Sequence, residues 1–225
     1  MALFINDAFF AVAGAAPFPR QRLYEWFTTL SAASVMHYTI PTLSLTGDFD
    51  LTVEIMVPSV SSIVTASMIL GNSGSTNNGL WVTSAGNIVI RDDAGSTQTS
   101  VAGITDGTLH TVRYVKTSGN VVGYIDGVEV EPSVAFGSFI IDRIGVRQAT
   151  AFPFDGVIRR LRVFSGATLA RLYPLRERTG SVIYDISGNE QHGATVNITD
   201  AERDPYSYES GAWTSSDGLT VIPVA

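Results

Sequence analysis

Hydrophobic and polar residues alternate in short runs along most of this chain. The clearest run is DFDLTVEIMV at residues 48–57. Its apolar side chains at alternate positions are Phe49, Leu51, Val53, Ile55 and Val57, and the polar ones between them are Asp48, Asp50, Thr52 and Glu54. Because successive side chains of a strand point to opposite faces, the run predicts a strand with one face in a core and an acidic face toward solvent.

A second run, residues 106–130, predicts a complete β-hairpin. Its arms are apolar at intervals, with Leu109, Val112 and Val115 expected to face the core, and the letters SGN supply the reversal between the arms. The pair Asp126-Gly127 predicts a further turn, because Asp and Gly are favoured in tight hairpin turns.

Ten runs between residues 31 and 198 have this strand-like character, separated by Gly, Asn, Ser and Asp. The predicted strands are 36–40, 49–57, 67–71, 79–83, 87–92, 97–102, 109–117, 121–125, 139–146 and 154–164. Short strands at this spacing, with no fixed repeat, predict an all-β fold, either a sandwich or a jelly roll. We expect an apolar N-terminal docking arm (1–30), the sandwich (31–198) and a polar C-terminal tail (199–225).

The arm contains two further patterns. Leu23, Trp26, Phe27 and Leu30 have the spacing of a short amphipathic helix, whereas the neighbouring threonines fit a strand nearly as well. The apolar run before them follows no basic region and is shorter than the roughly 20 residues that a membrane span needs. We therefore expect neither a secretory signal nor a membrane anchor.

Composition narrows the function classes. The 225 residues include no cysteine, which excludes disulfides and cysteine-ligated zinc, while 21 glycines and a single lysine favour strands and turns. Residues 143–178 hold eight arginines and two acids, a net charge of +6 within a chain of net −7. This cluster suits an acidic protein surface or an acidic glycan, with neutralisation by the chain's own acids as the alternative. A sequence pI of about 4.8 and the lack of a recognisable motif argue against nucleic acid.

Four segments together resemble the laminin-G-like, concanavalin A-like jelly-roll superfamily. They are GDFDLTVEIMV (47–57), the hairpin segment (106–130), FDGVIRRLRVF (154–164) and YPLRERTGSVIYDISGNEQHGATV (173–196). The resemblance implies an antiparallel two-sheet jelly-roll sandwich, with two curved sheets packed face to face and binding at a loop rim or on a concave sheet. The DISGN...HG segment follows the domain body here, whereas it precedes the body in many family members. This displacement leaves the identity of the terminal strands open, although the segment could still close a sheet beside the first strand. The layout also resembles structural proteins of tailed-phage virions.

The superfamily includes glycoside hydrolases, which cleave glycosidic bonds with a pair of carboxyl groups. A retaining pair needs carboxyl groups about 5 to 5.5 Å apart, whereas Asp50 and Glu54 are about 13 Å apart at strand rise. His37, His110 and His192 lack metal-binding spacing, and we expect His110 to be packed in the fold. With no GxSxG motif either, we predict that the chain is not an enzyme.

Two binding sites are candidates. Asp185, Ser187 and Asn189 form a DxSxN run that offers oxygen ligands to calcium, although such runs more often build turns. For glycan binding the best candidates are Trp81, Asn77 and Asn78, although a strand tryptophan more often packs in the core. No other cofactor is expected.

The favoured function is a structural protein on a phage virion surface, a capsid decoration (cement) or appendage component present in many copies or as a homo-oligomer. Its partners would be other virion proteins, with neither nucleic acid nor membrane involved. The predicted assembly residues are Phe4, Phe9, Phe10, Trp26, Arg159, Arg160, Arg162 and Trp213. The alternative is a glycan-binding adhesin, a receptor-binding module of a tail fibre.

Overall fold

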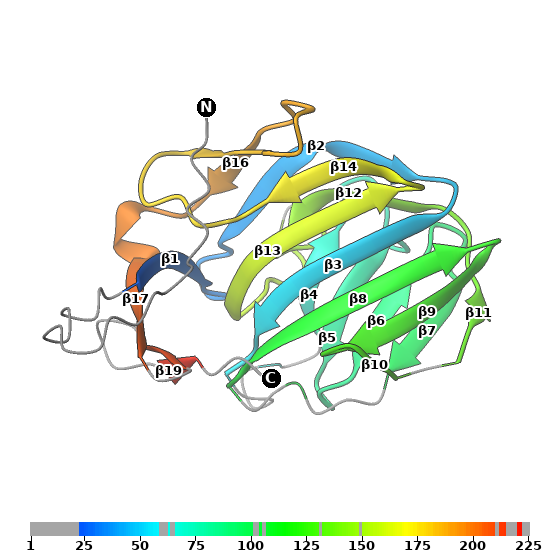
Figure 1. Ribbon diagram of the computed structural model, residues 1–225, viewed down its shortest axis with the longest axis horizontal. Helices are drawn as coiled ribbons and strands as arrows, with labels where there is room; N and C mark the ends of the chain where they lie inside the picture. Colours follow the sequence, from blue (N-terminus) through cyan, green and yellow to red (C-terminus); the bar gives the residue numbers. More distant parts are fainter. Residues whose placement is uncertain are drawn as a thin grey trace, which may run out of the picture.

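Two antiparallel β-sheets packed in two layers make up the fold (Figure 1). The computed structural model describes residues 23–58, 63, 66–100, 104, 107–130, 132–148, 150–209, 212–214 and 220–221. Every strand pairing in these ranges is antiparallel. The predicted all-β jelly-roll sandwich is confirmed.

The larger sheet has eleven strands within the described residues. Their spatial order is β10 (Val128–Glu129), β9 (Asn120–Ile125), β8 (Leu109–Thr117), β3 (Phe49–Met56), β13 (Gly156–Ser165), β1 (Leu23–Leu30), β17 (Arg203–Glu209), β18 (Ala212–Thr214) and β19 (Thr220–Val221). In addition, β11 (Val134–Ala135) pairs with β9, and β14 (Thr168–Tyr173) pairs with β13.

The smaller sheet has eight strands in the same described ranges. Their order is β15 (Val182–Ile183), β16 (Gly193–Val196), β2 (His37–Leu45), β12 (Phe139–Ile144), β4 (Ala66–Gly71), β5 (Gly79–Thr83), β6 (Ile88–Arg91) and β7 (Thr97–Ser100). In Figure 1 the strands β4, β5 and β6 lie behind β3 and β8 of the larger sheet.

The core lies between the two sheets. The apolar face predicted for residues 49–57 is confirmed, since its five side chains are buried in the core. On the other face Asp50 and Glu54 are half-buried, whereas Thr52 is buried and does not face solvent as predicted. Phe49 on β3 meets Phe139 on β12 with ring centroids 6.2 Å apart, which joins the two layers. Burial of each such large apolar side chain contributes about 1.5–3 kcal/mol, so these positions hold the sandwich together.

The two turns predicted in residues 107–130 are present. Ser118 and Gly119 have φ angles of 51° and 82°, and Asp126 and Gly127 have φ angles of 51° and 80°. Positive φ at both central residues is the geometry of a type I′ turn, which matches the twist of a hairpin. The first turn sets the register of β8 against β9, and the second sets that of β9 against β10.

The inward-facing side chains of β8 differ from the prediction. Val112 and Tyr114 join the core, but Leu109 and Val115 lie outside the core cluster, and Val115 is only half-buried. Residues an odd number of positions apart on one strand point to opposite faces, so Val112 cannot share a face with the other two.

Residues 23–30 form the strand β1, so the helical alternative for this segment is wrong. β1 pairs with β13 at Thr29 and Leu30, and with β17 along the rest of its length. Within the described residues, β1 and β17 lie outside the range 31–198 but belong to the same sheet as β13.

The late DISGN...HG segment closes the smaller sheet beside the first predicted strand, which was one of the possibilities left open by the sequence. β16 pairs with β2, where Ala194 lies opposite Thr39, and β15 forms the edge beyond it. A short 3-10 helix, η2 (Asp200–Glu202), follows. In the part of the chain that the structure describes, no helix is long and apolar enough to cross a membrane.

Candidate functional site

One row of paired residues crosses the outer face of the smaller sheet. Arg143 on β12 lies opposite Gly71 on β4. Gly71 in turn lies opposite Gly79 on β5, which lies opposite Arg91 on β6. Directly paired residues place their side chains on the same face. Leu80, which follows Gly79, is buried in the core, so by alternation the row faces outward.

A segment between β12 and β13 folds back over this row. A Cβ atom on Gly71 would lie 2.2 Å from the carbonyl oxygen that precedes Arg147 and 2.9 Å from the Cα of Arg147, so only glycine fits beneath this segment. Arg147 and Ala151 exchange both backbone hydrogen bonds, each 2.9 Å long. Met68 on β4 then donates its backbone N–H to the carbonyl of Phe152 at 2.9 Å. Arg147 and Phe152 are thereby held beside β4.

Trp81 on β5 lies on the same outer face. It pairs with Met68 on one side and with Val89 on the other, and its side chain is partly exposed. The guanidinium carbon of Arg91 lies 5.2 Å from the centre of the Trp81 ring, within the range of a cation–π interaction. Arg91 also donates from Nε to the hydroxyl of Thr97 at 3.2 Å. The face therefore presents an aromatic ring and a positive charge together.

Phe152 and Arg147 form a second pair of this kind. The guanidinium carbon of Arg147 lies 4.4 Å from the centre of the Phe152 ring, and Nη1 donates to the carbonyl of Thr76 at 3.2 Å. Burial lowers the pKa of Arg147, and the nearby charge of Arg91 lowers it further. We call the four residues Trp81, Arg91, Arg147 and Phe152 the arginine–aromatic surface.

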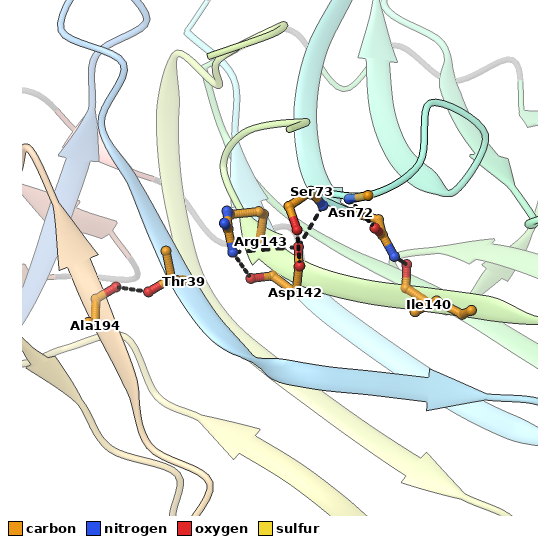
Figure 2. Close-up of polar contacts among 8 residues, drawn as sticks. Thr39, Asn72, Ser73, Ile140, Asp142, Arg143 and Ala194 are labelled. Atoms are coloured by element: carbon orange, nitrogen blue, oxygen red, sulfur yellow. Dashed lines mark hydrogen bonds and ion pairs between the residues drawn. The ribbon is translucent and has the colours of Figure 1, made fainter. Parts of the chain in front are cut away.

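Arg143, in the same row, has an acidic partner. Figure 2 shows Arg143 beside Asp142, with Nη1 3.6 Å from the Oδ1 atom of Asp142. Asp142 also accepts a hydrogen bond from the backbone N–H of Ser73 at 2.8 Å and one from its hydroxyl. In the described part of the chain, neither Arg91 nor Arg147 forms an ion pair. Among the described residues, the two arginines of the arginine–aromatic surface thus have no acidic partner.

The three residues predicted for glycan binding have different environments. Trp81 lies on the outer face rather than in the core, and Asn77 is exposed, with its amide donating to the carbonyl of Asp93 at 3.2 Å. Asn78 is fully buried. Its side-chain amide donates a hydrogen bond to the Asp93 carboxylate at 2.7 Å and accepts one from the backbone N–H of Ile140 at 2.9 Å. Asn78 therefore links β5 to β12 and is not accessible to a ligand.

Neither Arg91 nor Phe152 stood out in the sequence, and Arg147 stood out only as one of eight arginines. The run that ends at Arg91 is apolar and buried at all three preceding positions, so no alternation marks Arg91 as facing outward. Phe152 has no signal either, because its segment depends on positive φ angles of 55° at both Gln148 and Phe152, which non-glycine residues rarely adopt.

The acids of β3 form ion pairs on the outer face of the larger sheet. Arg113 bonds to Asp50 at 2.8 Å, and this hydrogen bond raises the pKa of Arg113. Glu54 lies 3.1 Å from Nη1 of Arg160 and 3.4 Å from Nε of Arg159. Arg159 and Arg160 therefore share one carboxylate, which fits the alternative of neutralisation by the chain's own acids in part. These contacts favour a structural role for both acids.

Two further predicted residues also lie on the larger sheet. Asp48 accepts a hydrogen bond from the backbone N–H of Ser118 at 2.9 Å, which ties it to the hairpin turn. Arg162 is exposed, and its guanidinium carbon lies 5.6 Å from the centre of the Phe164 ring. This pair resembles those of the arginine–aromatic surface but lies on the opposite sheet.

The other predicted assembly residues are less well defined. Phe4, Phe9 and Phe10 lie outside the described residues. Trp26 and Trp213 belong to β1 and β18, and their side chains also lie outside the described part. The assembly role of these five residues stays a prediction.

The histidines make hydrogen bonds within the fold. His110 is buried as expected, with Nδ1 2.7 Å from the carboxylate of Asp126 and Nε2 3.0 Å from the hydroxyl of Thr108. The Nδ1 atoms of His37 and His192 lie 2.9 and 3.1 Å from backbone groups. Among the described residues, no cluster of three or more His, Cys, Asp or Glu side chains is arranged to hold a metal ion.

The DxSxN run considered for calcium builds a turn. The Asp185 carboxylate accepts hydrogen bonds from the backbone N–H groups of Leu172, Ser187 and Gln191 and from the Ser187 hydroxyl. The amide of Asn189 donates to two backbone carbonyls of β14. These hydrogen bonds join the turn to β14, so the Asp185 carboxylate already accepts hydrogen bonds within the fold.

Comparisons with solved structures find the same architecture. A candidate carbohydrate-binding protein of Bacteroides ovatus matches with a TM-score of 0.59 and 17% identity over 76% of this chain. Domains LG4–5 of the mouse laminin α1 chain match with a TM-score of 0.48 and 19% identity over 69% of this chain. The chain spans 58% and 44% of those two chains, respectively. At these identities the likeness to the first structure establishes the fold alone.

Comparison with family models gives a more specific result. No curated protein matches the sequence. A laminin G family model, described as the concanavalin A-like lectin/glucanases superfamily, matches residues 32–171, which is more than half of the chain. This range includes all of β2 to β13 and therefore every residue of the arginine–aromatic surface. The chain belongs to the concanavalin A-like lectin/glucanases superfamily.

Proposed function

We propose that this chain is a glycan-binding module and that its arginine–aromatic surface holds the saccharide. The observation that carries the proposal is the position of Trp81, whose ring is partly exposed on the outer face of a rigid sheet. The apolar face of a sugar ring packs against aromatic side chains, and its hydroxyl groups accept hydrogen bonds from guanidinium groups. Trp81 and Arg91 supply both kinds of contact in adjacent positions.

The support beneath the surface is suited to this role. Met68 is buried, and its sulfur lies 3.1 Å from where a Cβ atom of Gly79 would be, so the strands under Trp81 pack closely. A binding residue held by packed strands keeps its orientation without a ligand, which lowers the entropic cost of binding. The saccharide would meet a preformed surface.

The fold is consistent with the proposal. The Bacteroides ovatus protein with the same architecture is a candidate carbohydrate-binding protein, and the superfamily is named in part for lectins. This chain covers 58% of that protein, so the likeness supports a binding module and says nothing of the remainder.

The test is binding of the full chain to a glycan array, compared with a Trp81→Ala variant. We expect wild-type binding to at least one glycan class and a loss of about tenfold or more in Trp81→Ala, with an unchanged melting temperature. The matched control is Tyr184→Ala, which removes a 53% exposed aromatic ring at the far edge of the same sheet. Binding to no glycan, or binding that survives Trp81→Ala, would overturn the proposal.

A location on a phage virion remains a separate proposal, and a glycan-binding appendage protein would combine it with the one above. Its test is deletion of residues 1–20 followed by measurement of incorporation into particles. Undiminished incorporation would rule out the anchoring role of the N-terminal arm.

A further inference from the structure

We infer that the saccharide held by the arginine–aromatic surface is acidic, and that its carboxylate or sulfate group lies between Arg91 and Arg147. The inference rests on the proposed function and adds the chemical class of the ligand. It is carried by the arrangement of these two arginines, their unused donors and their lack of acidic partners.

The arrangement places both guanidinium groups on one side of the sheet. The backbone of Arg147 passes over Gly71, and Gly79 separates Gly71 from Arg91 in the same row. Arg147 and Arg91 are therefore about two strand spacings apart at the backbone, roughly 10 Å. Two arginine side chains, each several ångströms long, can reach a common oxyanion across that distance.

The donors of both arginines are largely unused. A guanidinium carries five N–H donors. In the described ranges Arg91 uses Nε to reach Thr97, and Arg147 uses Nη1 to reach the Thr76 carbonyl. The Nε atom of Arg147 is buried without a hydrogen-bond partner in the described part of the chain, so contact with a ligand falls to the Nη groups of this residue. Donors held in this fork geometry match the oxygen atoms of a carboxylate or sulfate.

This surface is set apart by two arginines that lie near each other and, among the described residues, have no ion-pair partner. The chain has 21 acids and 14 basic residues, and Arg113, Arg143 and Arg160 each pair with a carboxylate. Arg91 and Arg147 lie close together with no acid between them in the described residues. An anion bound there would relieve their mutual repulsion, whereas a neutral sugar would leave it in place.

The aromatic rings explain why the anion would be part of a saccharide rather than a free ion. Each guanidinium lies over a ring, Arg91 over Trp81 and Arg147 over Phe152. A ligand that places an oxyanion between the arginines therefore also contacts two ring edges. A sugar acid has an apolar ring face next to its charged group, which fits both features.

The experiment uses a glycan array with neutral, uronic-acid, sialylated and sulfated glycans, probed with the full wild-type chain. The strongest ligand is then tested again after its carboxyl groups are reduced or its sulfates are removed. We expect acidic glycans to bind and their neutralised forms to lose about tenfold or more in affinity. This comparison involves no change to the protein, and the two treatments distinguish a carboxylate from a sulfate.

Variants then locate the contact. Arg91→Gln and Arg147→Gln should each lower affinity for the acidic glycan by about tenfold, with Arg147→Lys intermediate because it keeps the charge but loses the fork. The matched control is Arg162→Gln, which removes an exposed arginine stacked on Phe164 on the other sheet and should leave binding unchanged. Thermal unfolding of each variant checks that the fold is intact.

The outcomes separate the two proposals. If neutral glycans bind, and binding is lost in Trp81→Ala but not in Arg91→Gln or Arg147→Gln, the proposed function stands and the acidic ligand is wrong. If Arg162→Gln weakens binding as much as the other two, the charge effect is not local and the inference is wrong. If no glycan binds, the proposed function itself fails.

Discussion

The guanidinium carbon of Arg91 lies 5.2 Å from the centre of the Trp81 ring, although the two residues are on different strands and not directly opposite. Arg91 lies opposite Gly79, and Trp81 follows two positions later on β5. Because Gly79 has no side chain, the Arg91 side chain can lean diagonally across it to the ring. The pairing of charge and aromatic ring thus depends on a glycine.

Gly71 supports the same surface from below, and its substitution should be costly. In Gly71→Ala the new Cβ would lie 2.2 Å from a backbone carbonyl, which forces the segment around Arg147 to move. We expect a loss of roughly 2–4 kcal/mol in the free energy of unfolding, measured by denaturant titration. Gly47→Ala, where a Cβ would meet nothing within 4 Å, is the control and should change little. Equal midpoints for the two variants would show that the segment is not packed on Gly71.

Salt should weaken binding of the acidic glycan. Arg91 and Arg147 are partly exposed, so their attraction to an anion is screened by dissolved ions. Between about 0.1 M and about 1 M salt the screening length falls from about 10 Å to about 3 Å. We expect the dissociation constant, measured by calorimetry, to rise severalfold over this range. An affinity that does not respond to salt would indicate contacts dominated by uncharged groups.

The contact between His110 and Asp126 should support folding but not binding. The Asp126 carboxylate bonds to His110 at 2.7 Å and to the backbone N–H of Thr111 at 2.8 Å. Asp126→Ala removes both bonds at a position with φ of 51°, and we expect a loss of about 1–3 kcal/mol in stability. Asp126→Asn keeps an acceptor and tolerates this φ, so it should lose less. Glycan affinity should not change in either variant, because this pair lies on the larger sheet. A loss of glycan affinity in Asp126→Ala would place the binding site away from the arginine–aromatic surface.

Asp185 should make stability depend on pH in the acid range. Burial alone would raise the pKa of this carboxyl, but hydrogen bonds from Leu172, Ser187 and Gln191 outweigh it and hold the pKa below its ordinary value of 3.8. With the folded pKa below the unfolded one, this stabilisation is complete above the unfolded value and is lost as the pH falls through the folded value.

An Asp185→Asn variant tests this linkage. We expect wild-type stability to fall more steeply than that of the variant as the pH is lowered from about 5 to about 2, measured by thermal unfolding. Parallel curves for the two proteins would mean that Asp185 is not stabilised as a carboxylate in the fold.

Much of the fold could be predicted from alternation. The strands at residues 79–83 and 109–117 were predicted with the bounds that the structure has, because Asn, Gly, Ser or Asp turn residues stand close to both ends of each run. β14 was missed because its side chains are mostly half-buried and show no clear alternation. The sequence of residues 23–30 fits a helix and a strand nearly equally well. The structure has the strand, and its partner β17 lies far away in the sequence, where a local pattern cannot reveal it.

The candidate site could be predicted only in part. Trp81 was identified by its residue type, and its outward orientation follows from Leu80 and Val82, which occupy the inward positions on either side. The contribution of Arg147 and Phe152 depends on a segment that folds back over Gly71, and no short-range pattern encodes such a tertiary contact. Composition revealed an excess of arginine, but only the structure separates the paired arginines from the unpaired ones.

The most direct test of the account is a crystal structure of the full chain bound to the strongest acidic saccharide from the array. We predict that the sugar ring contacts Trp81 and that its carboxylate or sulfate lies within hydrogen-bond distance of both Arg91 and Arg147. A saccharide bound on the outer face of the larger sheet, or at the turn around Asp185, would contradict the account.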